Sequence, residues 1–443
     1  MPIPTLFEPF QPIAAIATTQ PAAQLFTALC PQIGAELHLP ASLAASFQQP
    51  GFQLPTQVFS EPLKDYVPKL WQSSQTLIFG LATGAVVRLI APLLTDKSQD
   101  PAVIVIDPLG QFVMSLCGGH QGGGDRLTRL IAQLIAGTPI VTGASQAVGL
   151  LPLDIFGETY GWQKGPGDWT RVSAIAANGQ RLQVRQTAGS QFWSQALTPD
   201  SAWSLVPEES NPQAYLDIGV HPPAITEREI PQVQWYPRVL WVGIGCVRGT
   251  PKALMAQALT QVCQTFNLAT EAIAGLASIE IKADEEGLVA LAEEWAFPLQ
   301  FYRAEQLREV EVPQASPRVE QEVGTPSVAE AAALLAARHY GEAQLIVPKQ
   351  ILKPAGYGIT VAIALAEREY LGHTGQLWLV GLGPGALEQM TPAARVAIVQ
   401  ADVIVGYSLY LAFIQSLKRP EQVIEAFPIT QERERCQRAI ALA

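Results

Sequence analysis

Short apolar runs alternate with amphipathic stretches along the first 150 residues of the chain. Five apolar runs have the length and continuity of buried strands: 13–17, 36–39, 76–80, 102–107 and 138–142. Apolar positions at helical spacing occur in three stretches: 21–29, 85–94 and 127–136. Repeated strand–loop–helix units predict a doubly wound α/β layer, with ligands at the carboxyl ends of its strands.

The pattern changes near residue 153. Gly/Trp-rich and Pro-rich stretches replace the regular alternation, and we expect a smaller α+β insert over 153–237. Within it we predict a hairpin, with strands at 172–176 and 181–184 joined by Asn178-Gly179.

A second α/β unit begins after residue 237. A strand at 239–244 leads through a Gly-containing loop into a helix at 252–266. Thr250 followed by Pro251 is typical of a helix start, with Thr250 as the N-cap. The remaining elements are expected in this order: helix 288–295, strand 299–302, helices 304–309 and 327–338, and strands 344–348 and 359–363.

The last segment restarts the pattern. A charged stretch over 367–375 predicts a linker, and a strand at 377–381, a helix at 391–400 and a strand at 403–406 follow it. The predicted parts of this multidomain chain are an N-terminal α/β domain (1–152), the insert (153–237), a C-terminal α/β domain (238–366), the linker and a partial α/β domain (376–443).

Composition limits the class of protein. Hydrophobic residues make up 48% of the chain, which is enough for sizeable cores, and the net charge of −11 argues against a nucleic-acid partner. The five cysteines are dispersed, so neither a disulfide framework nor a structural zinc site is expected. The longest apolar run, 77–94, is interrupted by Arg88, and no Lys or Arg precedes Lys64. We therefore expect a cytoplasmic protein without a membrane span or signal peptide.

One stretch combines glycines with reactive side chains. In Cys117-Gly118-Gly119-His120-Gln121-Gly122-Gly123-Gly124-Asp125-Arg126, five glycines occur within seven residues. Glycine lets backbone N–H groups approach a ligand closely, and the helix expected next adds the positive end of its dipole. An imidazole, a carboxylate and a guanidinium lie in the same ten residues. We therefore predict a binding or catalytic site on this loop.

At these residues the chain resembles the cobalt-precorrin-5A hydrolase family of anaerobic cobalamin biosynthesis. The resemblance to the family's N-terminal part lies in three segments: 82–88, 97–107 and 115–125. The resemblance to its C-terminal domain lies in three more: 242–251, 275–282 and 323–336. Together these motifs cover residues 70 to 365, whereas the middle insert carries little of the resemblance.

The segment after the linker resembles a different family. Gly381-Leu382-Gly383-Pro384-Gly385 and residues 401–407 are similar to the opening of precorrin-3B C(17)-methyltransferase, a tetrapyrrole methylase that uses S-adenosylmethionine. By this resemblance the cofactor-binding residues are Gly381, Gly383, Pro384 and Gly385. Such domains are several times longer than the stretch that ends at Ala443, so we expect a truncated methylase. Cofactor binding is expected only if that domain were complete.

The hydrolase resemblance implies opening of a δ-lactone on a cobalt-bearing macrocycle, with release of acetaldehyde. The cobalt is carried by the substrate, so no cofactor and no protein-bound metal are expected for this step. The reaction needs a base, oxyanion donors and cations for substrate carboxylates. His120 is the candidate base, because its ordinary pKa lies near neutrality, and a structural loop histidine is the alternative. Asp125 either orients the imidazole or caps the next helix, and the amides of Gly122, Gly123 and Gly124 are candidate oxyanion donors.

Cations beside Gly-bearing loops are the candidate carboxylate grips, since the planar fork of arginine binds a carboxylate at two points. Arg126 and Arg248 rank first, and each cation has an ordinary surface charge as its alternative. The full set of predicted substrate-binding residues is Thr83, Gly84, Arg88, Gly122, Gly123, Gly124, Arg126, Gly245, Arg248 and Thr250.

Other features have simpler interpretations. Cys117 near His120 suggests a thiolate nucleophile, but no feature lowers its pKa, and close packing is preferred for it and for Cys246. Gly243-Ile244-Gly245 lacks the third glycine of a dinucleotide fingerprint, so NAD is rejected. Four tryptophans of the insert suit either stacking on a macrocycle or core packing, with packing preferred: Trp162, Trp169, Trp193 and Trp203.

Three functions remain open from the sequence. The first is a cobalt-precorrin-5A hydrolase with a truncated methyltransferase attached, working with other cobalamin-pathway enzymes. The second is a non-catalytic module that binds a cobalt-tetrapyrrole intermediate and hands it to the methylase, since tethering raises effective concentration. The third is a chain that acts mainly as a methyltransferase.

Overall fold

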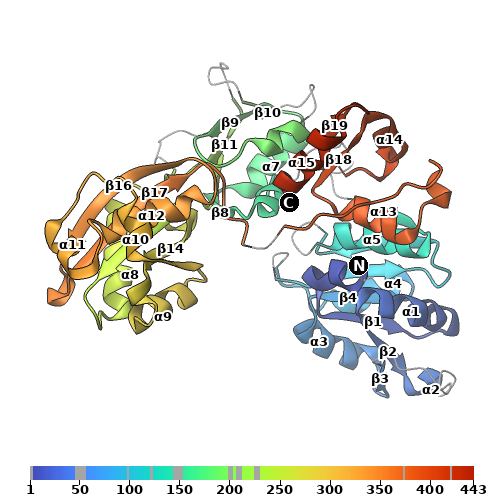
Figure 1. Cartoon of the computed structure of the whole chain (residues 1–443). Helices are drawn as coiled ribbons and strands as arrows, with labels where there is room; N and C mark the ends of the chain where they lie inside the picture. Colours follow the sequence, from blue (N-terminus) through green and yellow to red (C-terminus); the bar gives the residue numbers. More distant parts are fainter. Residues whose placement is uncertain are drawn as a thin grey trace. The chain divides into compact units, whose positions relative to one another are not determined.

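The computed structural model describes residues 3–44, 56–96, 99–119, 123–142, 153–197, 203–205, 212–223, 230–372, 375–419 and 422–443. The chain divides into two compact units. One contains Met1–Pro152 together with Gly375–Ala443, and the other contains Leu153–Thr374. In Figure 1 the first unit is therefore coloured from both ends of the bar.

The first unit contains a seven-stranded sheet in the order β3-β2-β1-β4-β5-β6-β7. Its strands are β1 (Ile13–Ala17), β2 (Glu36–Pro40), β3 (Thr56–Phe59), β4 (Thr76–Gly80), β5 (Ala102–Ile106), β6 (Phe112–Cys117) and β7 (Thr138–Ile140). The strands from β3 to β5 are mutually parallel, whereas β6 is antiparallel to β5 and β7 is parallel to β6. The predicted doubly wound α/β class is confirmed.

Helices cover both faces of this sheet, as the alternating side chains of β1 show. Ala15 and Ala17 belong to the apolar cluster formed with α1 and α5, and Ala14 and Ile16 belong to the cluster formed with α3 and α4. The helices of this region are α1 (Gln20–Ile33), α2 (Ala41–Ala44), α3 (Leu63–Ser73), α4 (Thr83–Ile90) and α5 (Gly124–Ile135).

Strand β6 was not predicted, and it changes where the glycine-rich loop lies. The sequence was expected to pass from the strand at 102–107 through the loop into a helix, but Phe112–Cys117 forms an intervening strand that runs back along β5. In that pairing Cys117 lies beside Val103, at the amino end of β5. The loop therefore follows the carboxyl end of β6 but lies at the amino edge of β1–β5, so its expected placement at the carboxyl end of the strand at 102–107 is wrong.

The C-terminal segment of the first unit is small. It consists of α13 (Pro392–Gln400), β18 (Val403–Tyr407), α14 (Ser408–Phe413), β19 (Val423–Phe427) and α15 (Glu432–Leu442), with β18 and β19 paired in parallel. Residues 377–381 are described and form no strand, so the prediction there is wrong. The two-stranded sheet contains no pairing with this stretch, and the Leu379 side chain is 94% exposed.

The second unit begins with the insert, whose sheet has the order β10-β9-β11-β12-β8. Its strands are β8 (Gln163–Gly167), β9 (Leu182–Gln186), β10 (Trp203–Ser204), β11 (Ala214–Ile218) and β12 (Gln232–Tyr236). The strand predicted at 172–176 is wrong, because these residues form helix α7 (Trp169–Ala177). Asp168 caps this helix by accepting from the Arg171 N–H at 3.0 Å, and Val172 and Ala176 lie four residues apart on its buried face.

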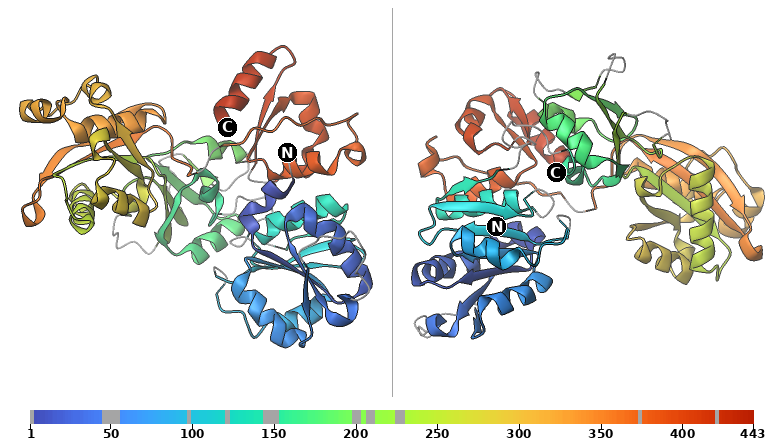
Figure 2. Two further views of the ribbon diagram at one scale, coloured as in Figure 1. Left: turned by 60° about the horizontal axis from the view of Figure 1, so that its bottom comes forward. Right: turned by 180° about the vertical axis from the view of Figure 1, so that it is seen from behind.

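A further five-stranded sheet follows in the order β15-β14-β13-β17-β16 (Figure 2). Its strands are β13 (Leu240–Cys246), β14 (Ile273–Ile279), β15 (Leu299–Tyr302), β16 (Ala343–Leu352) and β17 (Ile359–Ala366). Its helices are α8 (Lys252–Thr265), α9 (Glu286–Glu294), α10 (Ala304–Arg308), α11 (Pro317–Val323) and α12 (Val328–Arg338). Strands β13, β14 and β15 are parallel, so the loops after β13 and β14 share one edge of the sheet.

Small residues bring α12 against this sheet. The buried face of α12 is rich in alanine, and a Cβ on Gly243 of β13 would lie 1.8 Å from the carbonyl oxygen of Ala329. Only glycine fits at that distance. The first glycine of the Gly-x-Gly in β13 is thus explained by packing of helix on strand.

Candidate functional site

The glycine-rich loop between β6 and α5 is closely packed on both sides. Gly118 has a φ of +64°, and a Cβ there would lie 2.8 Å from the Cα of Ala102. A Cβ on Gly119 would lie 2.5 Å from Oδ1 of Asp125. Glycine is therefore required at both positions, because the Ala102 main chain lies against Gly118 and the Asp125 side chain lies against Gly119. His120 and Gly122, predicted as the base and as an oxyanion donor, lie outside the described residues.

The start of α5 uses amides that were predicted to bind a ligand. The Gly124 N–H donates to the Gly118 carbonyl at 3.1 Å, and the Asp125 N–H donates to the Gly119 carbonyl at 2.9 Å. The Gly124 amide is therefore already engaged, which argues against its predicted role as an oxyanion donor. Gly123, with a φ of +69°, occupies the cap position.

Asp125 lies within the first turn of α5, so it is not the N-cap of that helix. Its side chain is only 6% exposed and faces Gly119. A carboxylate here is stabilised by the positive end of the helix dipole. The helix thus presents a buried carboxylate beside the residue that precedes His120.

Arg126 does not point into an open site. Its Nη2 donates at 3.1 Å to the carbonyl of Gln400, and Gln400 is the last residue of α13. The structure therefore favours a structural role for Arg126 over the predicted grip on substrate.

Thr83, Gly84 and Arg88 lie elsewhere on the sheet. They belong to α4, which follows β4, and the loop between them is at the carboxyl edge of the parallel strands. Arg88 is exposed, and its Nη1 donates to the Gly84 carbonyl at 3.3 Å. Because the glycine-rich loop leaves the amino edge, the structure separates Thr83 and Gly84, at the start of α4, from that loop. Arg88 lies in the last turn of α4, further from the carboxyl edge.

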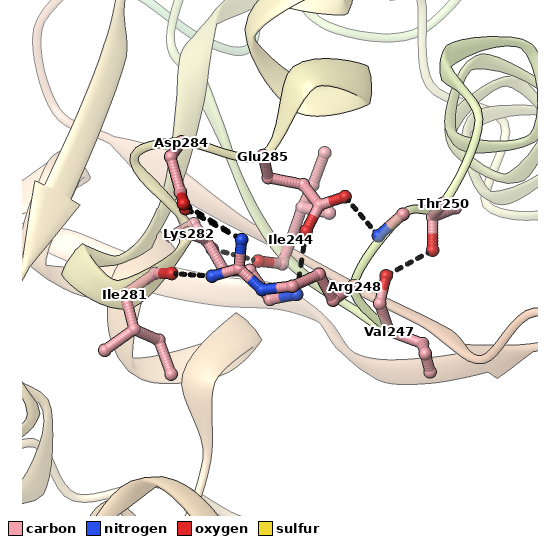
Figure 3. A network of polar contacts seen from close by, with 10 residues as sticks. Ile244, Val247, Arg248, Thr250, Ile281, Lys282, Asp284 and Glu285 are labelled. Atoms are coloured by element: carbon pink, nitrogen blue, oxygen red, sulfur yellow. Dashed lines mark hydrogen bonds and ion pairs between the residues drawn. The ribbon is translucent and has the colours of Figure 1, made fainter.

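The loop after β13 lies beside the loop after β14, and this pair of loops presents an exposed cation (Figure 3). Arg248 Nη1 donates to both carboxylate oxygens of Asp284, at 3.1 and 3.0 Å, and its Nη2 donates to the Ile281 carbonyl at 3.0 Å. The side chains of Arg248 and Asp284 are 61% and 73% exposed. The hydrogen bond to Asp284 raises the pKa of Arg248 and lowers that of Asp284.

Below this exposed pair lies a buried carboxylate. Glu285, 2% exposed, accepts from the Gly249 N–H at 2.7 Å and from Lys282 Nζ at 3.0 Å (Figure 3). Gly249 has a φ of +78°, a conformation that glycine adopts readily. Glu285 therefore fixes the backbone turn from which Arg248 projects.

The other two predicted residues of this loop shape it from below. A Cβ on Gly245 would lie 2.5 Å from Oγ1 of Thr360 on β17. Thr250 is buried and its hydroxyl donates to the Val247 carbonyl at 2.6 Å. Pro251 occupies the cap position of α8, so the prediction of Thr250 as N-cap is wrong. Gly245 and Thr250 therefore stabilise the turn rather than face a ligand.

Sequence reasoning missed the partners of Arg248. Lys282, Asp284 and Glu285 were not selected because β14 was not predicted as a strand, so nothing placed residues 280–285 next to the loop after β13. The available signal was the continuous apolar run of Ile273–Ile279, followed at once by charged residues.

Both cysteines near these loops have raised pKa values. Burial is the largest cause for Cys117, with a smaller contribution from Asp100. Burial raises the pKa of Cys246 to about 11. Both thiols are thus protonated near neutral pH, which disfavours the thiolate alternative.

The tryptophans of the insert form a core. Trp162, Trp193 and Trp203 are buried and pack around Phe156. Trp169 is half-buried, with Lys164 Nζ 4.5 Å from its ring centroid. The first three rings are unavailable for stacking on a macrocycle.

The predicted cofactor loop of the C-terminal segment is a turn with little cover. Gly381, Gly383 and Pro384 are exposed, and Gly383 has a φ of +63°. Gly385, with a φ of +107°, lies against the Phe413 ring.

Two general features concern the described residues only. None of their helices has the length and apolar character needed to cross a membrane. Within the same residues, His, Cys, Asp and Glu side chains form no group of three or more suited to holding a metal ion.

Comparison with known protein families identifies consecutive segments. Residues 65–146 match the family model for the cobalamin synthesis G N-terminal region, 151–237 match the cobalamin biosynthesis central region, and 240–364 match the cobalamin synthesis G C-terminus. Residues 376–442 match the tetrapyrrole (corrin/porphyrin) methylases.

Individual relatives agree with this order. The chain is 32% identical over 320 residues to a cobalt-precorrin-5A hydrolase of Priestia megaterium, covering 70% of this chain and 83% of that protein. It is 30% identical over 348 residues to a cobalt-precorrin-5A hydrolase of Salmonella typhimurium, covering 76% of this chain and 94% of that protein.

The C-terminal segment has a separate relative. It is 41% identical over 69 residues to a cobalt-factor III methyltransferase of Priestia megaterium, covering 16% of this chain and only 13% of that protein. With its N-terminal, central and C-terminal regions all matched, the chain belongs to the cobalt-precorrin-5A hydrolase family and carries a short tetrapyrrole methylase segment fused after them.

Proposed function

We propose that this chain hydrolyses the δ-lactone of cobalt-precorrin-5A and releases acetaldehyde. The likeness to two hydrolases over most of their lengths is the observation that carries this proposal. Water adds to the lactone carbonyl and the C–O bond breaks, giving a carboxylate and an alkoxide. The alkoxide becomes acetaldehyde as its carbon–carbon bond to the macrocycle breaks, and the electron pair left on the ring takes up a proton.

His120 is the proposed base for the attacking water. Its ordinary pKa is near 6.5, so a neutral imidazole is available at neutral pH. Support comes from the neighbouring residues: Gly119 is held against α5, and the buried carboxylate of Asp125 lies beside it. Asp125 is proposed to orient the imidazole, with Gly122 and Gly123 as the remaining candidate donors to the oxyanion.

Arg248 is the proposed grip for a substrate carboxylate. Its Nη1 already donates to both carboxylate oxygens of Asp284, so this nitrogen is presented to a carboxylate at the surface. An exposed ion pair of this kind is weak, and a substrate carboxylate can replace Asp284. A local cation is needed, because the net charge of the chain is −11 and the substrate is an anion.

Thr83 and Gly84 are proposed to bind the substrate away from the glycine-rich loop. The strands between the two edges of the sheet are five residues long, which is about 13 Å. The start of α4 is therefore about one strand length from Gly119, whereas Arg88, in the last turn of α4, stays a proposed grip for a substrate carboxylate.

The test is acetaldehyde release by the full chain supplied with cobalt-precorrin-5A, with the mass of the macrocycle followed in parallel. The proposal predicts one acetaldehyde for each macrocycle that loses two carbons. Tight binding of an unchanged macrocycle would instead support the handover function, which the fused methylase segment favours.

We propose further that the methylase segment alone binds no S-adenosylmethionine. It covers 13% of its methyltransferase relative, and the described glycine loop is largely exposed. Calorimetric titration of the full chain with S-adenosylmethionine tests this, and measurable binding would contradict it.

The chain is also proposed to act in the cytoplasm beside other cobalamin-pathway enzymes, which fractionation of the source cells can check.

A further inference from the structure

Burial extends beyond one face of helix α5, which lies against β5 and β6. Leu127, Leu130 and Ile131 have the spacing of a single apolar face, and Thr128 and Ala132 beside that face are buried as well. A helix that covers one face of a sheet normally leaves its outer side polar and solvated. The wider burial of α5 indicates a second covering element.

Helix α13 of the methylase segment provides that cover. Val396 and Val399 are buried in the same apolar cluster as Leu127, Leu130 and Ile131. Figures 1 and 2 show α13 alongside α5, and the two helices are in direct contact. The cluster also includes Trp378 and Leu417 as partly buried members, so the contact involves more of the segment than one helix.

The opposite face of α13 belongs to the methylase segment itself. Ile398 packs in a separate cluster with Met390, Leu411 and Ile414. Helix α13 is thus apolar on two faces. One face is directed to its own segment, and the other is directed to α5 in residues 1–152, which are called the hydrolase part below. An ordinary passenger domain joined by a linker would not require the second apolar face.

Polar contacts fix the carboxyl end of α13. The last carbonyls of a helix lack partners within the helix. Here Arg126 donates to the Gln400 carbonyl at 3.1 Å, Arg419 Nε donates to that of Val399 at 2.6 Å, and Gln422 Nε2 donates to that of Ile398 at 2.6 Å. Arg126 comes from the hydrolase part, so the two parts share the capping of one helix, and both guanidinium groups suit the negative end of its dipole.

We propose that residues 375–443 are an integral part of the N-terminal hydrolase unit, with the outer face of α5 as the docking surface for the first helix of a tetrapyrrole methylase. Val396 and Val399 are the apolar anchors of this interface, and Arg126 is its polar clamp. The inference does not depend on which reaction the chain catalyses.

Hydrogen exchange of the full chain tests the interface. Val396→Thr keeps the shape but places a hydroxyl against α5, and Arg126→Gln removes the charge from the clamp. Both variants are expected to increase the exchange rates of amides 127–135 by about tenfold, since opening of α5 becomes easier. The matched controls are Val172→Thr, which makes the same change in buried α7 of the other unit, and Arg433→Gln, which removes an exposed cation from α15.

The proposal holds if α5 loses protection in the first two variants while the controls stay within twofold of the parent. Unchanged exchange of α5 in Val396→Thr and Arg126→Gln would overturn it. So would faster exchange confined to β18 and β19, since the segment would then open without affecting the hydrolase part. Because exchange is read without substrate, this result is independent of acetaldehyde release.

Discussion

The loops that enter α5 and α8 make the same turn from strand to helix by different means. The loop before α5 is closed by glycine contacts and by backbone hydrogen bonds from Gly124 and Asp125. The loop before α8 is held by Glu285 from the neighbouring strand's loop, and Gly249 there has open space around it. Close contacts therefore explain Gly118 and Gly119 in the first loop, whereas Gly249 in the second loop is explained by its positive φ alone.

This difference separates the proposed roles of the two loops. The first places a buried carboxylate beside Gly119, the residue that precedes the proposed base in the chain, which suits the proposed proton transfer. The second projects an exposed guanidinium from a turn fixed by a buried carboxylate, which suits binding of an anion. Changes in the first loop should affect the reaction rate, and changes in the second should affect substrate binding.

Loss of the Glu285 carboxylate is expected to have the largest effect on stability. Glu285→Ala removes the buried partner of Lys282, whose side chain is only 12% exposed, and releases the Gly249 N–H. Breaking a buried pair in this way typically costs about 4 kcal/mol. Urea denaturation measures the change in free energy of unfolding. Asp284→Ala, at an exposed carboxylate, is the control, and similar losses in both variants would contradict the distinction between the buried and exposed groups.

Glycine substitutions compare the two loops at the backbone. Gly119→Ala places a Cβ 2.5 Å from the buried Asp125 carboxylate, and overpacking of this kind costs about 2 kcal/mol. Gly249→Ala meets no described atom within 4 Å, so only its positive φ is unfavourable, at about 1 kcal/mol. Thermal unfolding of both variants measures the order. A greater loss for Gly249→Ala would show that the first loop is not the more closely packed one.

Replacement of Arg248 tests the binding role of the second loop. Arg248→Gln removes the charged fork, and loss of a charge-assisted contact is expected to raise KM for the lactone about tenfold with kcat nearly unchanged. Asp284→Asn is the useful companion, because it frees Arg248 from its present partner and should not raise KM. Steady-state acetaldehyde release measures both. A fall in kcat without a change in KM would contradict a role in binding alone.

The smallest expected effect concerns pH and the first unit. His38 is buried, hydrogen-bonded through Nδ1 to the Tyr66 hydroxyl at 2.8 Å, and 3.5 Å from Glu36. Burial lowers its pKa below the ordinary 6.5, against a smaller opposing effect of Glu36. Below pH 6.5 the His38 imidazole binds a proton more readily in the unfolded chain than in the folded one. The free energy of unfolding therefore decreases as the pH is lowered from 6.5, until the pH lies below the pKa of His38 in the folded chain.

His38→Gln removes that titration and should flatten the pH dependence of unfolding below pH 6.5. Chemical denaturation at a series of pH values measures the slope in the parent and the variant. An equal slope in both would show that His38 does not contribute.

Local patterns predicted most elements, and the failures have physical causes. The strand at 76–80 and the helix at 252–266 follow from their own apolar spacing. Residues 172–176 were misassigned because a short apolar run fits both the helical period and the strand period. The N-cap by Asp168 favours the helix that forms there. Residues 377–381 have the composition of a strand, but a strand needs pairing partners, which the small sheet of this segment does not provide.

The sites were harder to predict than the elements, because chain direction controls which loops meet. Omission of β6 placed Thr83 and the glycine-rich loop at the same edge of the sheet, whereas one antiparallel strand puts them at opposite edges. Similarly, the contact of Arg126 with Gln400 joins residues 274 positions apart, which no local pattern reveals.

The decisive measurement is the single-turnover rate of acetaldehyde release from cobalt-precorrin-5A by a saturating excess of His120→Ala. If the first loop performs the proton transfer, release slows by at least about a hundredfold while the affinity for the lactone stays within twofold of the parent. Release at the rate of the parent, with the same affinity, would contradict the assignment of the chemistry to this loop.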